Sequence, residues 1–297
     1  MNPPSRPYRS LLFVPGHKTD WVEKGLASGA DAIVLDLEDS VPHDAKATAR
    51  AAVAGSIARV RESGVETPIF VRPNSLATRA AGTDIEAVAQ PGLAGFFVPK
   101  VASPLDVVRY EALIDHFEHT AGASGLRMIV PVEMVGAIVA CEQIAAASPR
   151  VAAMVGPTSR FADIARAVGY RWTAEGLESL YHRSRVLVAC RAASVLPLTA
   201  LWDDVHDLEG LRRFAEQGRQ LGFVGQIVIH PSHVPIVNEV YGPDEAELEF
   251  YRGLVAAFDD AVDRGDAAVL YRGQHIDQAH ADTARERLAQ FESVGRG

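Results

Sequence analysis

The chain has 297 residues, of which 48% are hydrophobic and 23% are charged, and its formal net charge at pH 7 is −9. This length allows either two domains or one barrel of about 250 residues with an appendage. Because the sequence has no cluster of lysine and arginine residues, we expect neither a nucleic acid nor an anionic membrane as a partner.

Several features of the sequence favour the cytoplasm. No apolar run approaches the roughly 20 residues that span a bilayer, and residues 1–7 lack the basic and then apolar layout of a signal peptide. Cys141 and Cys190 lie in helical contexts rich in alanine and valine, and they show neither a disulfide framework nor a zinc-binding spacing. We therefore expect a cytoplasmic protein that is not attached to a membrane.

Short apolar runs alternate with helical patterns along most of the chain. The expected strands span residues 11–14, 32–35, 69–71, 95–99, 127–132, 151–155, 198–202 and 226–229. The expected helices follow them at residues 20–28, 45–61, 85–89, 104–120, 135–147, 164–168, 208–221 and 234–240. About eight strand–helix units are the number in a (β/α)8 barrel, or TIM barrel. An open doubly wound sheet would show a Gly-rich phosphate turn, and its nearest candidate, Val14-Pro15-Gly16, lacks the second and third glycines.

Two regions lie outside the eightfold pattern. After the sixth unit, residues 173–195 show a long additional helical pattern. Beyond residue 243, a helix over 245–262, a break at 264–266 and an ordered segment at 270–277 precede a polar, helix-prone end. We therefore predict an α/β protein with a TIM barrel domain at residues 1–242. The C-terminal helical extension at residues 243–297 is predicted to act as a lid or as an oligomer arm.

Polar residues follow nearly every expected strand. The densest group ends the second strand, where an apolar run gives way to Asp36, Glu38 and Asp39. Since α/β barrels place their chemistry at the C-terminal ends of the strands, we expect these side chains to meet at one rim. The other strand-end residues are His17, Lys18, Arg72, Asn74, Lys100, Glu133, Asp163 and His230.

The carboxylates at this rim suit a hard divalent cation. Glu133 and Asp163, with Asp36 or Glu38 behind them, provide oxygen ligands of the kind that Mg²⁺ takes together with retained waters. Zinc is disfavoured because the strand-end histidines lack a clustered partner.

The basic residues at the rim leave alternatives open. Arg72 offers a planar fork that suits a substrate carboxylate, or else it pairs with the acidic group. Lys100 is open to the same two interpretations, one structural and one catalytic. His230 either packs beside Pro231 or contacts the substrate, and Lys24 on the first helix is by default a solvated charge.

The chain resembles the citrate lyase β-subunit-like, or malyl-CoA lyase-like, branch of the HpcH/HpaI aldolase family. The matching stretches are residues 9–16, 29–39, 71–74, 98–100, 222–225, 229–231 and the tail segment that ends at Asp277. This resemblance implies a TIM barrel that cleaves or forms a carbon–carbon bond in a 3-hydroxy-3-carboxyl acyl-CoA. Citryl-, malyl- and citramalyl-CoA are such substrates, and the products are an acyl-CoA and a 2-oxo acid.

The resemblance also implies roles for particular residues. Glu133 and Asp163 would hold Mg²⁺, and Arg72 would bind the carboxylate of the oxo acid, next to Glu133. Asp277 would be the acid/base group, delivered by the tail of a neighbouring subunit, so a homo-oligomer such as a trimer or hexamer is expected. The residues bordering the CoA or the substrate would be Phe13, Lys24, Ile229 and His230. Those supporting the site from behind would be Asp36, Glu38, Asp39 and Lys100.

The sequence departs from the family pattern in several places, among them Pro73 after Arg72 and Gln274-His275 in the tail. Two departures bear on the metal site. Met134 stands where the family usually has threonine, and Asp163 lies seven residues beyond Gly156, where the family's metal-binding aspartate lies about three beyond. If the longer loop takes Asp163 out of reach, Asp36 or Asp39 would complete the metal site. Alternative functions are a thioesterase on the same substrates, a CoA-independent hydroxy-oxo-acid aldolase and an inert partner subunit.

Overall fold

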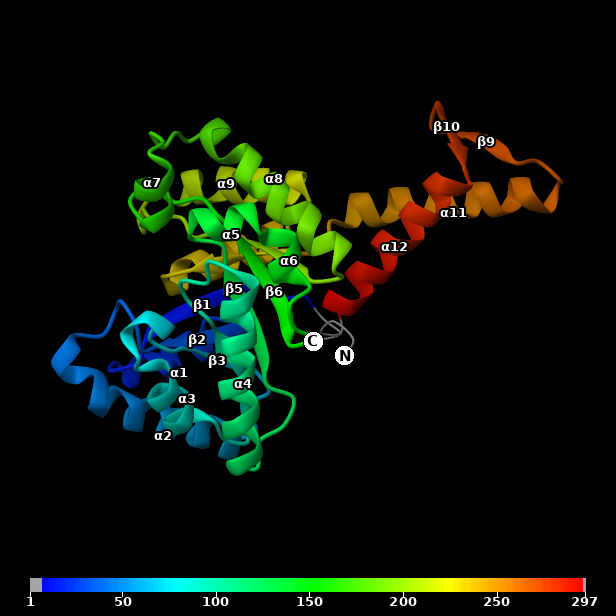
Figure 1. Ribbon diagram of the computed structural model, residues 1–297. Coiled ribbons are helices and arrows are strands. Elements are labelled where there is room, and N and C mark those ends of the chain that lie inside the picture. The colour runs from blue at the N-terminus through cyan, green and yellow to red at the C-terminus, as the bar shows by residue number, and fades with distance from the viewer. Residues whose placement is uncertain (1–6, 296–297) are drawn as a thin grey trace. The chain divides into compact units, whose positions relative to one another are not determined.

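Eight parallel strands close into a barrel in the order in which they occur along the chain, with β1 pairing with β8 (Figure 1). This computed structural model describes residues 7–295, and side chains as far as residue 289. The segment 1–6, on which the signal-peptide argument depends, lies outside the described residues. The strands are β1 (Ser10–Pro15), β2 (Ala32–Asp36), β3 (Ile69–Arg72), β4 (Leu93–Phe97), β5 (Arg127–Pro131), β6 (Val151–Gly156), β7 (Leu196–Thr199) and β8 (Gly225–Val228). The predicted TIM barrel is confirmed.

Helices surround this barrel and connect its strands. They are α1 (Asp20–Ala27), η1 (His43–Ala45), α2 (Lys46–Glu62), η2 (Leu76–Thr78), α3 (Ala81–Val88), α4 (Pro104–Thr120), α5 (Val135–Val139), α6 (Cys141–Ala145), α7 (Asp163–Val168), α8 (Leu177–Ala192), α9 (Leu208–Leu221), η3 (Pro231–His233) and α10 (Val234–Val240). The single helix expected over 135–147 is two short helices, because the backbone at Ala140 leaves the helical region, with φ −109° and ψ 20°.

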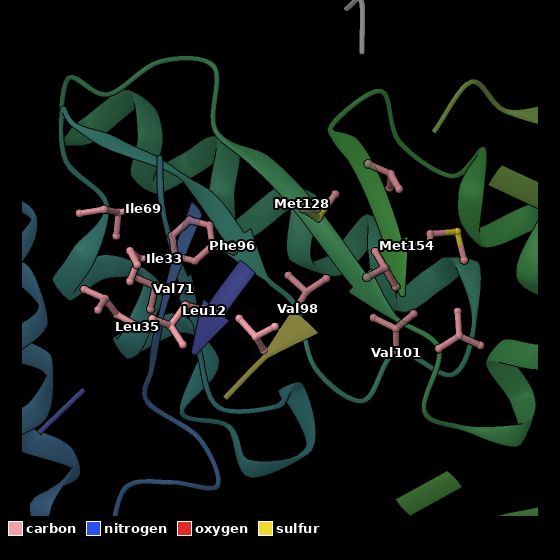
Figure 2. Packing of buried hydrophobic residues seen from close by; sticks show 14 of the residues in the cluster. Leu12, Ile33, Leu35, Ile69, Val71, Phe96, Val98, Val101, Met128 and Met154 are labelled. Atoms are coloured by element: carbon pink, nitrogen blue, oxygen red, sulfur yellow. The ribbon is translucent and has the colours of Figure 1, made fainter. Parts of the chain in front are cut away.

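Successive side chains of a strand point to opposite faces, so a barrel strand must be apolar on both. Leu11, Val34 and Phe70 fill the barrel interior. Leu12 and Ile33 point the other way and pack under the helices, in the layer that Figure 2 shows. All five residues of β2 are buried, which explains its continuous apolar run. Burial of each such leucine or isoleucine stabilises the fold by about 1.5–3 kcal/mol.

A close backbone contact fixes the rim between β1 and β2. The amide N–H of Gly16 donates to the carbonyl oxygen of Asp36 at 2.7 Å. A Cβ atom at position 16 would lie 2.5 Å from that oxygen, so a glycine is required there. The acidic end of β2 is therefore held close to the end of β1.

A second unit begins at Gly242. It contains α11 (Glu245–Asp263), the antiparallel hairpin of β9 (Ala268–Tyr271) and β10 (Gln274–Asp277), and α12 (Gln278–Gly295). The hairpin turn is Arg272-Gly273, both with positive φ, as a two-residue turn requires. The small core of this unit contains Leu254, Phe258, Ile276, Ala281 and Ala284. Whether the unit acts as a lid or an oligomer arm stays a prediction.

Two further expectations concern the chain as a whole. In the part of the chain that the structure describes, no helix combines the length and apolar character needed to cross a bilayer. Cys141 and Cys190 are both buried and not joined in a disulfide, as expected of small hydrophobic side chains.

Candidate active site

A cavity of about 340 Å³ lies at the carboxyl ends of the barrel strands. Its polar lining includes Asp36, Arg72 and Glu133, the residues at or just beyond the ends of β2, β3 and β5. Most of the remaining lining is apolar, and it includes Phe13, Phe97, Val132, Val155, Leu201, Ile227 and Ile229. The cavity therefore combines a few charged groups with mostly apolar walls, as ligand-binding sites do.

Asp36 and Arg72 face each other across neighbouring strands and form a two-point ion pair. Arg72 Nε donates to Asp36 Oδ1 at 2.6 Å, and Arg72 Nη2 donates to Oδ2 at 2.7 Å. Burial by itself would raise the pKa of Asp36, but the hydrogen bonds and charge of Arg72 bring that pKa below its usual value. The guanidinium also lies over the ring of Phe13, 5.1 Å from its centroid. Arg72 thus pairs with the acidic group and still lines the cavity.

Glu38 and Lys100 extend this charge network. Glu38 Oε2 lies 3.2 Å from Arg72 Nη1, and Glu38 Oε1 lies 3.3 Å from Lys100 Nζ. Burial, with repulsion from Asp39 and Glu133, raises the pKa of Glu38 to about 7, although Arg72 and Lys100 oppose this shift. At neutral pH this carboxyl group is therefore close to half protonated when no further cation is present.

Lys46 was not among the residues expected at the rim. Its ammonium donates to the carbonyl oxygens of Leu37 and Glu38 and to Asn74 Oδ1. It therefore holds the loop that follows β2 against the loop that follows β3, and so positions the acidic group.

Glu133 is oriented by the backbone of Lys100. The Lys100 N–H donates to Glu133 Oε1 at 2.6 Å, and Lys100 adopts a left-handed conformation with φ 54°. A residue other than glycine in this conformation stores roughly 1–2 kcal/mol of strain, a cost typical of functional sites. Burial raises the pKa of Glu133, the Lys100 N–H and Arg72 oppose the rise, and Asp163 adds to it.

Asp163 adjoins the cavity and belongs to the same network. Asp163 Oδ2 lies 3.8 Å from Lys100 Nζ, and Oδ1 pairs with Arg166 one turn further along α7. Its neighbours Ala162 and Ile164 line the cavity. Despite the longer loop after Gly156, Asp163 is thus at the same rim as Glu133.

These residues fit Mg²⁺ better than a metal that needs many protein ligands. Among the described residues, no three His, Cys, Asp or Glu side chains are grouped to hold a metal. Mg²⁺ commonly takes one or two carboxylates and leaves its other positions to water and substrate oxygens. Burial raises the pKa of Glu38 and of Glu133 although Arg72 and Lys100 oppose the rise, so a bound cation would further favour their ionised forms. Glu38 Oε2 is buried and accepts no hydrogen bond of good geometry within the described residues.

The other predicted site residues divide into two groups. Phe13 and Ile229 line the cavity, whereas Lys24 is exposed on α1 and is not in the lining. His230 is exposed, and its Nδ1 is bonded to Ser232 Oγ at 2.7 Å. A role for Lys24 or His230 in CoA binding stays a prediction.

Asp277 is a partly buried residue of the second unit, with 47% of its side chain exposed. Its Oδ1 lies 2.6 Å from His280 Nδ1 and accepts the backbone N–H groups of Ala279 and His280. The hydrogen bonds from His280 lower the pKa of Asp277. The delivery of this carboxylate to a neighbouring subunit stays a prediction, and His280 is a partner that the sequence had not indicated.

Other cavity residues were also missed by sequence analysis. Trp21, in the first turn of α1, lines the cavity with 49% of its surface exposed. The loop after β6 contributes Pro157, Thr158 and Ser159. Trp21 had no signal of its own in the sequence, because it reaches the cavity only through the placement of α1 after β1.

The chain is therefore a TIM barrel with an acidic, arginine-containing cavity at its mouth. The match is specific: the chain belongs to the HpcH/HpaI aldolase/citrate lyase family, which matches residues 9–231.

Similar proteins carry two kinds of name. A (3S)-malyl-CoA thioesterase of Cereibacter sphaeroides is 33% identical and covers 98% of this chain and 96% of its own. An L-malyl-CoA/beta-methylmalyl-CoA lyase of the same species is 34% identical, covering 98% and 97%. The structure of CitE from Mycobacterium tuberculosis in complex with magnesium, acetoacetate and coenzyme A has 26% identity and a TM-score of 0.73, covering 99% and 98%. A Burkholderia xenovorans citrate lyase shares the fold, with 19% identity, a TM-score of 0.83 and coverage of 97% and 92%.

Proposed function

We propose that this protein is a Mg²⁺-dependent carbon–carbon lyase that acts on a 3-hydroxy-3-carboxyl acyl-CoA such as malyl-, citramalyl- or citryl-CoA. The observation that carries the proposal is the meeting of Glu133, Asp163 and Arg72 in one charge network at the barrel mouth. Membership of the aldolase and citrate lyase family supports this reaction class. The relatives named above act on malyl-CoA by name, which supports a CoA thioester substrate.

Glu133 and Asp163 would hold Mg²⁺, and the ion would polarise the oxygen atoms of the 2-oxo acid and stabilise the charge that develops there. Arg72 would bind the oxo-acid carboxylate. Asp36 takes Nε and one hydrogen of Nη2, and Nη1 lies 3.2 Å from Glu38 Oε2. The fork is therefore fixed in place and would bind the substrate through the N–H groups that are left over. The apolar walls would exclude water from the reacting atoms.

In the cleavage direction, the 3-hydroxyl group would give its proton to the carboxylate of Asp277 of a neighbouring subunit, and its oxygen would become the 2-oxo oxygen of the oxo acid. The bond between C2 and C3 breaks, and its electron pair forms the enolate of the acyl-CoA. An acid then protonates the enolate carbon, and we assign this proton transfer to Asp277 of a neighbouring subunit. In the synthetic direction the same carboxylate removes that proton. The lowered pKa of Asp277 keeps its carboxylate ionised, as the base must be, and burial at another subunit would raise its pKa for the acid role.

A thioesterase reaction is the second candidate, because the thioesterase and the lyase named above resemble this chain to almost the same degree. Product analysis with malyl-CoA and citramalyl-CoA separates the two functions. A lyase gives an acyl-CoA and a 2-oxo acid, whereas a thioesterase gives free CoA and the intact hydroxy acid. Formation of free CoA without any oxo acid would contradict the lyase assignment.

A further inference from the structure

A second cavity, of about 160 Å³, lies between residues of α8 and α9 and shares no residue with the barrel-mouth cavity. Arg183 lines it and is only 1% exposed. The other lining residues are Glu175, Gly176, Leu177, Leu180, Gln217, Gln220 and Leu221. Both helices are labelled in Figure 1.

Arg183 is a buried cation with neutral partners. Nη1 donates to Gln217 Oε1 at 2.8 Å and Nη2 donates to the Gly176 carbonyl oxygen at 3.0 Å. Nε is buried and has no hydrogen-bond partner among the described residues. The nearby carboxylate of Glu178 accepts from Thr173 N and Oγ1 at 2.9 and 2.8 Å instead.

An unpaired buried charge is expensive, and a buried cation is normally found with an anion. The cavity also lies beside the N-terminus of α8, a helix of 16 residues whose first turn favours negative charge and carries Glu178, the carboxylate bonded to Thr173. We infer that this cavity binds a small oxyanion, held by the Arg183 guanidinium beside the first turn of α8.

The size of the cavity limits the ligand. The cavity has a volume of about 160 Å³, less than half the 340 Å³ of the barrel-mouth cavity. Inorganic phosphate and a short carboxylate are of a size to fit this space. Glu175, exposed at the mouth, opposes an anion and weakens binding without blocking it.

The test measures melting temperature and calorimetric binding as inorganic phosphate, malonate or chloride is added, with ionic strength held constant. We expect the melting temperature to rise saturably with phosphate or with malonate. The anion that the cavity prefers should give the larger rise. In Arg183→Met, affinity is expected to fall at least about tenfold, since a hydrogen bond to a charged group is lost. Arg191→Met, which removes an exposed arginine of the same helix, should leave the response intact.

A second variant keeps the test decisive if Arg183→Met does not fold. Gln217→Glu places a carboxylate on Arg183 Nη1, so it should raise the melting temperature without phosphate and abolish the phosphate response. An equal response in the wild-type protein and in either variant would show a general salt effect and overturn the inference. A response to chloride alone would overturn the assignment of an oxyanion.

Discussion

The backbone N–H of Lys100 donates to the carboxylate of Glu133 at 2.6 Å from a left-handed conformation. The side chain of the same lysine reaches Glu38 and Asp163. Lys100, in the loop after β4, therefore has two roles. Its backbone orients Glu133, a proposed metal ligand, and its ammonium group pairs with the carboxylates of Glu38 and Asp163. This arrangement makes the charge balance of the rim testable.

The stability of the metal-free protein should depend on Glu38 between pH 5 and pH 7. Its pKa is about 7 in the folded protein, above the value of about 4.3 in an unfolded chain. The folded state thus binds the proton more tightly, and stability falls as pH rises through this range. The loss is at most roughly 3 kcal/mol, at about 1.4 kcal/mol per pKa unit.

Denaturant unfolding in EDTA at pH 5 and pH 7.5 measures this loss. Glu38→Gln should reduce it, whereas Asp39→Asn, whose side chain is 64% exposed, should not. If Glu38→Gln and the wild-type protein lose the same stability between the two pH values, the raised pKa of Glu38 is wrong.

Arg72 should be required both for stability and for binding of the oxo acid. Arg72→Met leaves Asp36 buried without its partner, which costs about 3–5 kcal/mol. Arg72→Lys keeps a charge but not the fork, so it should lose less stability and still bind pyruvate weakly in calorimetry. The matched control is Arg50→Met, because Arg50 pairs with the buried Asp84 at 2.6 Å outside the cavity lining. Arg50→Met should lose comparable stability and keep its affinity for pyruvate. A loss of that affinity in Arg50→Met would show that the effect of Arg72→Met on pyruvate binding is indirect.

Asp277 should act in the site of another subunit. We expect Asp277→Asn and Glu133→Ala each to abolish turnover when expressed alone. Co-expression of the two variants should restore part of the activity, because mixed oligomers contain sites with both intact residues. Asp266→Asn, at an exposed aspartate of the second unit, should remain active. Mixed oligomers without activity, or an active Asp277→Asn, would refute this role.

The sequence was sufficient to predict the barrel and the rim residues, for physical reasons. A parallel barrel buries both faces of each strand, so β2 shows a continuous apolar run before its acidic end, and every strand end lies at the same rim. The pairing at the rim was not predictable in detail. Whether Arg72 pairs with Asp36 or is free for a ligand depends on the register between β2 and β3. That register places Asp36 directly opposite Arg72.

Other features depend on tertiary contacts that local patterns do not encode. Trp21 reaches the cavity because α1 begins close to the end of β1. The hairpin before Asp277 requires both Arg272 and Gly273 at positive φ, and a single glycine in the sequence is too weak a signal for it. The buried Arg183 lies in a helix whose sequence indicated only an insertion, since no local pattern shows that its guanidinium has no acidic partner.

Calorimetric titration with pyruvate in the presence and absence of Mg²⁺ tests the central claim most directly. The wild-type protein should bind pyruvate saturably only when Mg²⁺ is present, and Glu133→Ala should bind neither the ion nor pyruvate at the same concentrations. Binding of pyruvate that is independent of Mg²⁺, or unchanged in Glu133→Ala, would contradict a metal site at the mouth of this barrel.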